Sequence, residues 1–211
     1  MNKICYIFGA GSCEGAYIKN PFIVIGADGG YEYLLKNGIR ADIVLGDFDS
    51  LGYIPKGENV MVLPREKDET DTAAAVRIGI EKGADTFIIY GGLGGCLDHT
   101  IANIQLICAL NKKGYKAFLL GEHSVITIIN DSEISFDSCL SGYVSVFAHS
   151  DTCEGVSIKG LKYCLDNARL KNSQALGVSN EFIGSPAKIT VRSGALTVMW
   201  QQTAQSFIEN F

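Results

Sequence analysis

Short apolar runs alternate with amphipathic stretches through the first 121 residues. The runs predict strands at residues 3–8, 22–27, 42–45, 59–63 and 86–90. Between several of them, apolar positions at helical spacing predict helices that stop at Gly38, Gly83 and Gly114, where a glycine commonly terminates a helix. This alternation of strand and helix predicts an α/β domain built on a parallel sheet.

The pattern changes in the rest of the chain, where short β-type runs follow one another and no long helical period is visible. These runs lie at residues 125–129, 143–148, 156–158, 188–192 and 196–201. Their spacing predicts a small antiparallel sandwich or a partly open barrel. The small polar residues after Gly177 are typical of a β-turn. We therefore expect two domains, residues 1–121 and 122–211, with Gly121 at the boundary.

Aspartates follow the predicted strands of the first domain or open the helices after them. The acids concerned are Asp28, Asp47, Asp49, Asp71 and Asp98. Each has a plain alternative explanation, because aspartate and threonine, including Thr70 here, cap helices and form turns. The carboxyl ends of parallel strands share one edge of a sheet, however, so a common site is the more economical interpretation. Carboxylates crowded together there would suit Mg²⁺ and the phosphates of a nucleotide.

A glycine-rich loop follows the strand predicted at residues 86–90. It consists of Gly91, Gly92, Leu93, Gly94 and Gly95. Glycine lets backbone N–H groups wrap closely around phosphate oxygens, so this loop predicts phosphate binding. It is neither a Walker loop nor part of a protein-kinase signature. The glycines that follow the first strand have the wrong spacing for a dinucleotide fingerprint, which leaves a nicotinamide oxidoreductase as a remote alternative. The acids and the loop together predict phosphoryl or pyrophosphoryl transfer.

Composition and charge narrow the class of partner. The 211 residues are 47% hydrophobic and carry a net charge of -5, with 14 acids and 12 bases up to residue 121 and 9 acids and 6 bases after it. Neither part is basic, which argues against nucleic acid and is compatible with a cationic or metal-bound substrate. No membrane-spanning run or signal-peptide pattern is visible, and the seven cysteines form no Cys-x-x-Cys pair, so we expect a cytoplasmic protein with reduced thiols and no membrane partner.

Five segments occur in the order found in thiamine pyrophosphokinases, which the sequence resembles over residues 27–181. They are Ala27-Asp28-Gly29-Gly30, Gly46-Asp47-Phe48-Asp49-Ser50, Lys67-Asp68-Glu69-Thr70-Asp71, Gly91 to Gly95 with Asp98-His99, and Gly177-Val178-Ser179-Asn180-Glu181. The resemblance implies a Rossmann-like α/β domain that binds ATP, a smaller all-β sandwich domain, and a homodimer with thiamine held between subunits. It also implies transfer of the terminal pyrophosphoryl group of ATP to the hydroxyl of thiamine, leaving AMP.

The resemblance also implies roles for individual residues. It assigns Asp28, Asp47, Asp49 and Asp71 to Mg²⁺ and the phosphates, and places Asp98 close by among the catalytic acids. It assigns Gly29, Gly30, Thr70, Gly91, Gly92, Gly94 and Gly95 to ATP. It assigns Tyr163, Ser179 and Asn180 to thiamine. An acidic site suits the thiazolium cation, whose ring can also lie against an aromatic face.

One position departs from the family pattern, because Cys96 stands where the family usually has an arginine. A cysteine offers phosphate neither a positive charge nor a fork of donors. Lys67 and Arg65, which lie on the loop before Asp71, are the candidates to compensate. A diphosphokinase for another primary alcohol, such as a hydroxymethyl-pterin, and a catalytically silent nucleotide or thiamine sensor remain alternatives. Which aspartate, if any, takes the hydroxyl proton stays open.

Overall fold

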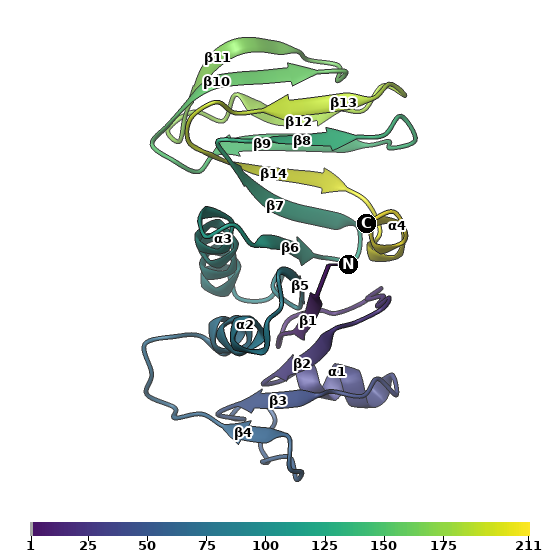
Figure 1. Cartoon of the computed structure of the whole chain (residues 1–211), viewed down its shortest axis with the longest axis vertical. Helices are drawn as coiled ribbons and strands as arrows, with labels where there is room; N and C mark the ends of the chain where they lie inside the picture. Colours follow the sequence, from purple (N-terminus) through teal and green to yellow (C-terminus); the bar gives the residue numbers. More distant parts are fainter. Residues whose placement is uncertain (1) are drawn as a thin grey trace.

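The computed structural model describes residues 2–211, which form two β-sheets and four helices (Figure 1). The larger sheet has ten strands in the order β12-β9-β14-β7-β6-β5-β1-β2-β3-β4. Along the chain, its strands are β1 (Ile4–Phe8), β2 (Ile23–Ala27), β3 (Ile43–Gly46), β4 (Val60–Val62), β5 (Thr86–Tyr90), β6 (Lys116–Leu120), β7 (Ser124–Asn130), β9 (Tyr143–Ala148), β12 (Gly177–Glu181) and β14 (Ala195–Gln201). The helices are α1 (Gly30–Lys36), α2 (Asp71–Lys82), α3 (Leu97–Lys112) and α4 (Ala204–Glu209).

Six neighbouring strands of the large sheet are parallel. Their spatial order is β6-β5-β1-β2-β3-β4, so β1 lies between β2 and β5. Helices cover both faces of this half, so its inner strands contribute to two cores, whereas Met61 and Val62 of the edge strand β4 are exposed. In β5, Phe87 and Ile89 belong to the core under α2 and α3, whereas Ile88 and Tyr90 belong to the core under α1. A strand that is buried on both faces has a continuous run of apolar residues in its sequence. The predicted α/β class with a parallel sheet is therefore confirmed.

The large sheet continues through residue 121 and becomes antiparallel there. Gly121 N donates to Ser124 O at 2.9 Å in the turn that joins β6 to β7, and these two strands pair with each other. The smaller sheet has the order β11-β10-β13-β8 and covers one face of the antiparallel half, which gives the predicted β-sandwich (Figure 1). Its strands are β8 (Glu133–Phe136), β10 (Thr152–Lys159), β11 (Leu165–Lys171) and β13 (Ala187–Thr190). The division at Gly121 lies within one hydrogen-bonded sheet and remains a prediction.

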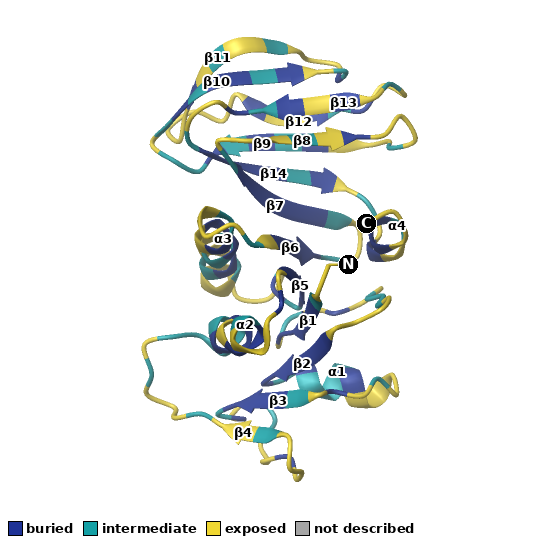
Figure 2. Cartoon of the chain, viewed as in Figure 1, coloured by how far each residue is buried: buried dark blue, intermediate teal, exposed yellow. Residues whose placement is uncertain are grey.

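Two hydrophobic cores lie on opposite faces of the large sheet. The core that contains Leu34 of α1 also includes Trp200 of β14 and Phe207 of α4, so it runs without a break into the sandwich. Buried positions, dark blue in Figure 2, occur in strands of both halves. The other core contains Ile107 of α3, a helix that packs against both β6 and β7. Apolar packing therefore links the parallel and antiparallel halves on both faces.

Several elements were not predicted, and the β-turn expected after Gly177 is wrong, because residues 177–181 form β12. This strand lies at the edge of the large sheet, where small polar side chains are tolerated. A Cβ on Gly177 would overlap Val146 of β9, so the glycine permits the close pairing of the two strands. The other missed elements are β6, β8, β11 and α4. Of these, β11 is polar and α4 is short, whereas β6 carries an apolar run that the pattern could have identified.

All seven cysteines are free thiols, as the sequence predicted, and Cys5 and Cys108 are among the buried ones. Burial, with a smaller contribution from the charge of Asp42, raises the pKa of Cys5 to about 12. This thiol therefore stays protonated and unreactive at neutral pH. Within residues 2–211, no helix has the length and apolar character needed to cross a membrane.

The continuous core predicts that the parallel half and the sandwich unfold together in one cooperative transition. Leu34→Ala in α1 should therefore also destabilise the distant sandwich. Leu34 is 0% exposed, so its truncation should lower the free energy of unfolding by about 2–5 kcal/mol. Urea unfolding followed by fluorescence of Trp200, the single tryptophan, checks this. The matched control is Leu35→Ala on the same helix, because Leu35 is 52% exposed and should change little. A fluorescence transition unmoved by Leu34→Ala would contradict the linked core.

Candidate active site

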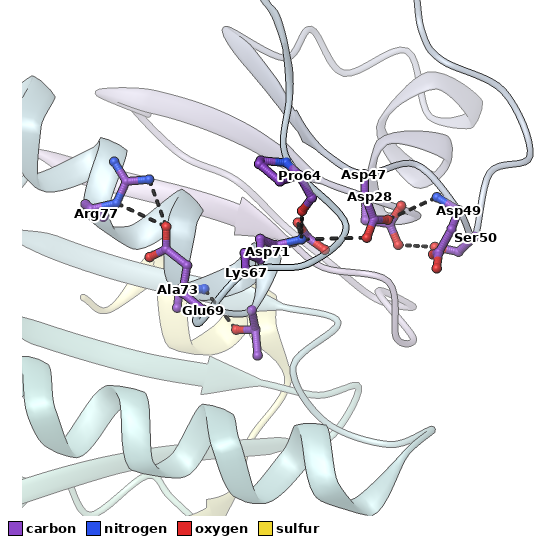
Figure 3. A network of polar contacts seen from close by, with 11 residues as sticks. Asp28, Asp47, Asp49, Ser50, Pro64, Lys67, Glu69, Asp71, Ala73 and Arg77 are labelled. Carbon is purple, nitrogen blue, oxygen red and sulfur yellow. Dashed lines mark hydrogen bonds and ion pairs between the residues drawn. The ribbon is translucent and has the colours of Figure 1, made fainter.

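Three predicted acids come together at the carboxyl edge of the parallel half. Asp28 directly follows β2, and Asp47 and Asp49 follow the neighbouring strand β3 (Figure 3). One carboxylate oxygen from each can be chosen so that all three lie within 4.8 Å of one another. Such a set of oxygen ligands is the kind that hard divalent cations prefer.

Asp28 is held by unusual backbone geometry. Its φ is 48°, its N–H donates to Leu45 O at 2.8 Å, and its side chain is buried, with the residue 8% exposed. Oδ2 accepts a hydrogen bond from Ser50 Oγ, whereas Oδ1 is buried without a hydrogen-bond partner among residues 2–211. Gly46 makes this packing possible, because a Cβ there would lie 3.1 Å from Asp28 Cα. A buried carboxylate oxygen without a donor fits a bound cation.

The turn after β3 directs Asp47 and Asp49 toward the site by burying the residue between them. Phe48 has a φ of 58° and is buried, which leaves the flanking carboxylates on the outside of the turn. Asp49 N donates to Asp47 Oδ1 at 3.1 Å and fixes the turn. Arg65 Nη2 lies 3.4 Å from Asp49 Oδ2, in an ion pair that is well exposed to solvent. Exposed pairs of this kind contribute little to stability.

Asp71 joins the cluster through a lysine. Lys67 Nζ lies 3.1 Å from Asp71 Oδ1 and 3.7 Å from Asp47 Oδ2 (Figure 3). Within the described chain, Asp71 Oδ1 is buried and the contact is an ion pair without an aligned hydrogen bond. Burial raises the pKa of Asp71 and outweighs the opposite effect of Lys67. Burial alone would lower the pKa of Lys67, but the contacts with Asp71 and Asp47 raise it overall, so the lysine is charged.

A cavity of about 240 Å³ adjoins these acids, and five of the residues that line it are glycines. It is lined by Ala10, Gly11, Ala27, Asp28, Thr70, Asp71, Thr72, Gly91, Gly92, Gly94, Gly95, Cys96, His99 and Asn103. Thr70 has a second function as the N-cap of α2, where its Oγ1 accepts from Ala73 N at 3.2 Å. The predicted glycine loop, Thr70 and two of the acids therefore face one cavity.

The glycine loop is shaped by two neighbours that sequence reasoning did not assign to the site. Gly11 N donates to Gly91 O at 3.1 Å, and Asn103 Nδ2 donates to Gly92 O at 3.0 Å. Gly91 has a φ of 68°, and a Cβ there would overlap Gly9 O. Gly9 and Gly11 follow β1 at the same edge of the sheet, and this position could have indicated the contact from the sequence. The i, i+4 spacing of His99 and Asn103 on α3 was the other signal.

Three further predicted residues lie outside this arrangement. Asp98 is exposed, accepts from its neighbour His99 N at 2.8 Å, and is not among the residues that line the cavity. Gly30 packs under the backbone of Phe8, where a Cβ would overlap the carbonyl oxygen. Gly29 lies beside Ala10 and Ser50. The two glycines thus support the loop around Asp28, and His99 faces the cavity in place of Asp98.

The residues predicted for thiamine lie at the other end of the large sheet. Tyr163 is 60% exposed, and Lys162 Nζ lies 5.6 Å from its ring centroid. Asn180 is buried, where its Oδ1 accepts from Tyr163 N and Glu181 N, both at 2.9 Å, and its Nδ2 donates to Tyr163 O at 2.7 Å. Asn180 therefore holds the Tyr163 loop against β12. Ser179 is exposed with a φ of 57°, and its N–H donates to Ser145 Oγ.

Two family models match the chain. The model described as "Thiamin pyrophosphokinase, catalytic domain" matches residues 15–119. The model described as "Thiamin pyrophosphokinase, vitamin B1 binding domain" matches residues 127–196. Together they account for most of the chain, and they cover both the acidic edge and the segment that carries Tyr163.

Individual proteins agree with these matches. The thiamine pyrophosphokinase of Bacillus subtilis (strain 168) is 31% identical over 190 residues, which cover 87% of this chain and 89% of that protein. A crystal structure of thiamine pyrophosphokinase from Bacillus subtilis gives a TM-score of 0.82 at 26% identity, covering 95% of this chain and 99% of the other. The corresponding structure from Geobacillus thermodenitrificans gives 0.80 at 27% identity, covering 95% and 98%. This chain belongs to the thiamine pyrophosphokinase family.

Proposed function

We propose that the chain uses the acidic edge of its parallel sheet to transfer the pyrophosphoryl group of ATP to the hydroxyl of thiamine, giving thiamine diphosphate and AMP. ATP-dependent pyrophosphoryl transfer to thiamine is the reaction of the family to which the chain belongs. The observation that supports this use of the edge is the convergence of three carboxylates beside a cavity that is lined in part by the glycine loop. The matches to both halves do not favour a pterin diphosphokinase or a silent sensor.

Asp28, Asp47 and Asp49 are the residues that we propose hold Mg²⁺, with Asp71 beside them. Their donor atoms are all carboxylate oxygens, and the unpartnered Asp28 Oδ1 gives a buried position for a cation. A magnesium ion bound there would neutralise charge on the phosphates as the leaving AMP separates. The aspartates themselves fix where that charge is neutralised, since the turn around Phe48 and the packing at Gly46 allow them little freedom.

We propose that the triphosphate of ATP lies in the cavity beside the acids. The cavity is lined by the loop glycines Gly91, Gly92, Gly94 and Gly95 and by Gly11, which leave room for phosphate oxygens to approach the backbone closely. Cys96 also lines the cavity, so the position of the usual family arginine carries no charge here. Of the two candidate replacements, Lys67 lies within the acid cluster and Arg65 lies at the surface. Lys67 is thus the better placed cation.

We propose that thiamine contacts Tyr163 and Ser179, with Asn180 positioning them, and that the β half supplies this part of the site. On this proposal, residues 1–121 bind ATP and residues 122–211 bind thiamine. The exposed tyrosine ring can stack on a cationic ring, and the Ser179 side chain is exposed on the edge strand. The acidic edge would favour the approach of a positively charged substrate.

A homodimer is part of this proposal, because one chain cannot bring its two substrate regions together. β12 and β3 are separated by eight strand steps in the large sheet, which is roughly 38 Å at the usual strand spacing. A second copy could place its β12 region against the acidic edge of the first. Exposed apolar side chains near β12 support a contact surface there. They are Tyr143, Tyr163, Leu176, Val178 and Ile183.

We also propose a cytoplasmic location without nucleic-acid partners. Seven free thiols fit a reducing compartment. The net charge of -5 gives no basic footprint for nucleic acid.

Identification of the nucleotide product tests the proposed reaction. The protein is incubated with ATP, Mg²⁺ and thiamine, and the products are separated by chromatography. AMP and thiamine diphosphate in equal amounts are expected. ADP would indicate ordinary phosphoryl transfer, and binding without turnover would indicate a sensor, so either result would contradict the proposal.

Asp47→Asn and Asp49→Asn should each reduce kcat by at least about a hundredfold, because electrostatic stabilisation at a transferring phosphoryl group is worth several kcal/mol. Steady-state kinetics at saturating ATP, Mg²⁺ and thiamine measure this, and circular dichroism checks that the variants are folded. The matched control is Asp68→Asn, since Asp68 is an exposed acid on the loop before α2. Its kcat should stay near the parent value. Equal losses of kcat in all three variants would show that Asp47 and Asp49 have no specific role in the reaction.

Tyr163→Ala should raise the KM for thiamine by roughly 3- to 30-fold, the range expected for loss of a cation–π contact, and change the KM for ATP little. Initial rates with one substrate varied at a time provide both constants. Tyr163→Phe, which keeps the ring, serves as the control and should resemble the parent. Equal increases in both KM values would argue against assigning thiamine to the β half.

A further inference from the structure

Lys67 is an unusually enclosed lysine that lies between Asp71 and Asp47 (Figure 3). Its side chain is 14% exposed, and lysine is seldom buried to this extent without a partner. Three oxygens from three segments surround its ammonium group. Asp71 Oδ1 lies at 3.1 Å, Pro64 O accepts a hydrogen bond at 3.2 Å, and Asp47 Oδ2 lies at 3.7 Å. The contact with Pro64 O is a hydrogen bond, and the two carboxylates lie within ion-pair distance, so two acids compensate the ammonium charge.

The lysine and the proposed metal site share one carboxylate. Asp47 is a member of the oxygen cluster formed with Asp28 and Asp49, and its Oδ2 also faces Lys67 Nζ. Its other oxygen, Oδ1, already accepts from Asp49 N. Asp47 therefore cannot give its full charge to a divalent cation while it remains paired with Lys67.

This sharing has opposite consequences for a metal ion alone and for a metal ion bound with nucleotide. Lys67 repels a second cation nearby and already neutralises part of the charge of Asp47 and Asp71. Phosphate groups would bring negative charge that can pair with the ammonium group as Asp47 turns to the metal. Lys67 would then oppose Mg²⁺ by itself and favour Mg²⁺ that arrives with the triphosphate.

We infer that Lys67 is a positioning residue that holds Asp47 and Asp71 together and makes Mg²⁺ binding at this edge depend on nucleotide. The inference rests on the proposed magnesium site. It also accounts for an uncharged Cys96 beside the glycine loop, since Lys67, which is paired with Asp71 of the cavity lining, would supply the charge for the phosphates. Arg65 does not fill this role, because its contact with Asp49 is exposed to solvent.

Calorimetric titration of the full-length Lys67→Met variant tests the inference without an activity assay. Mg²⁺ is titrated first alone and then with α,β-methylene-ATP, whose bond at the transfer position cannot be cleaved. Relative to the parent, the Kd for Mg²⁺ alone should fall about tenfold and the Kd for the analogue at saturating Mg²⁺ should rise about tenfold, as expected for loss of a charged contact. Lys67→Gln, which keeps a polar head without the charge, should move both constants in the same directions and covers the case in which Lys67→Met does not fold.

Arg65→Met is the matched control, because it removes a neighbouring cation whose ion pair is exposed, and both constants should stay within about twofold of the parent. If removal of Lys67 lowers the melting temperature but leaves both constants unchanged, the residue is merely structural and the inference is overturned. It is also overturned if Mg²⁺ alone binds more weakly. A parent protein that does not bind Mg²⁺ even with the analogue would overturn the metal site itself and this inference with it.

Discussion

The mutual repulsion of carboxylates at the carboxyl edge of the parallel sheet is the constraint on which the rest of the site depends. Asp28 and Asp47 directly follow the neighbouring strands β2 and β3, so the pairing of the strands brings their charges together. Left-handed backbone at Asp28 and a glycine at position 46 hold this arrangement. Lys67 offsets part of the charge. A bound divalent cation would offset the rest, which is why we interpret the edge as a magnesium site.

The continuous ten-stranded sheet gives the molecule a second constraint. It joins the acidic edge and the β12 region rigidly through shared cores on both faces, yet keeps them roughly 38 Å apart at the usual strand spacing. A hinge within one chain could not close such a gap without breaking the sheet. The proposed composite site between two copies satisfies both requirements, since each subunit can stay rigid while the two substrates meet. Asn180 contributes by fixing the Tyr163 loop to the edge strand.

The sequence predicted those parts of the fold that have strong local signals. Apolar runs located β1 to β5, and the cap at Thr70 and the terminating Gly83 located α2. The convergence of Asp28, Asp47 and Asp49 followed from the shared edge of a parallel sheet. Local signals could not show that the exposed side chain of Asp98 lies outside the cavity lining. They also could not show that the Asn180 amide donates a hydrogen bond to Tyr163, or that the polar residues after Gly177 form an edge strand. These features depend on contacts between distant parts of the chain.

The proposed active site combines the acidic edge of one copy with the β12 region of another. Mixed dimers test it most directly. Asp47→Asn and Tyr163→Ala chains are co-expressed with different affinity tags, and dimers carrying both tags are isolated and assayed at thiamine below its KM. A composite site predicts about half of the parent activity, because one of the two sites then contains only parent residues. Activity no higher than the mean of the two separate variants would contradict the claim.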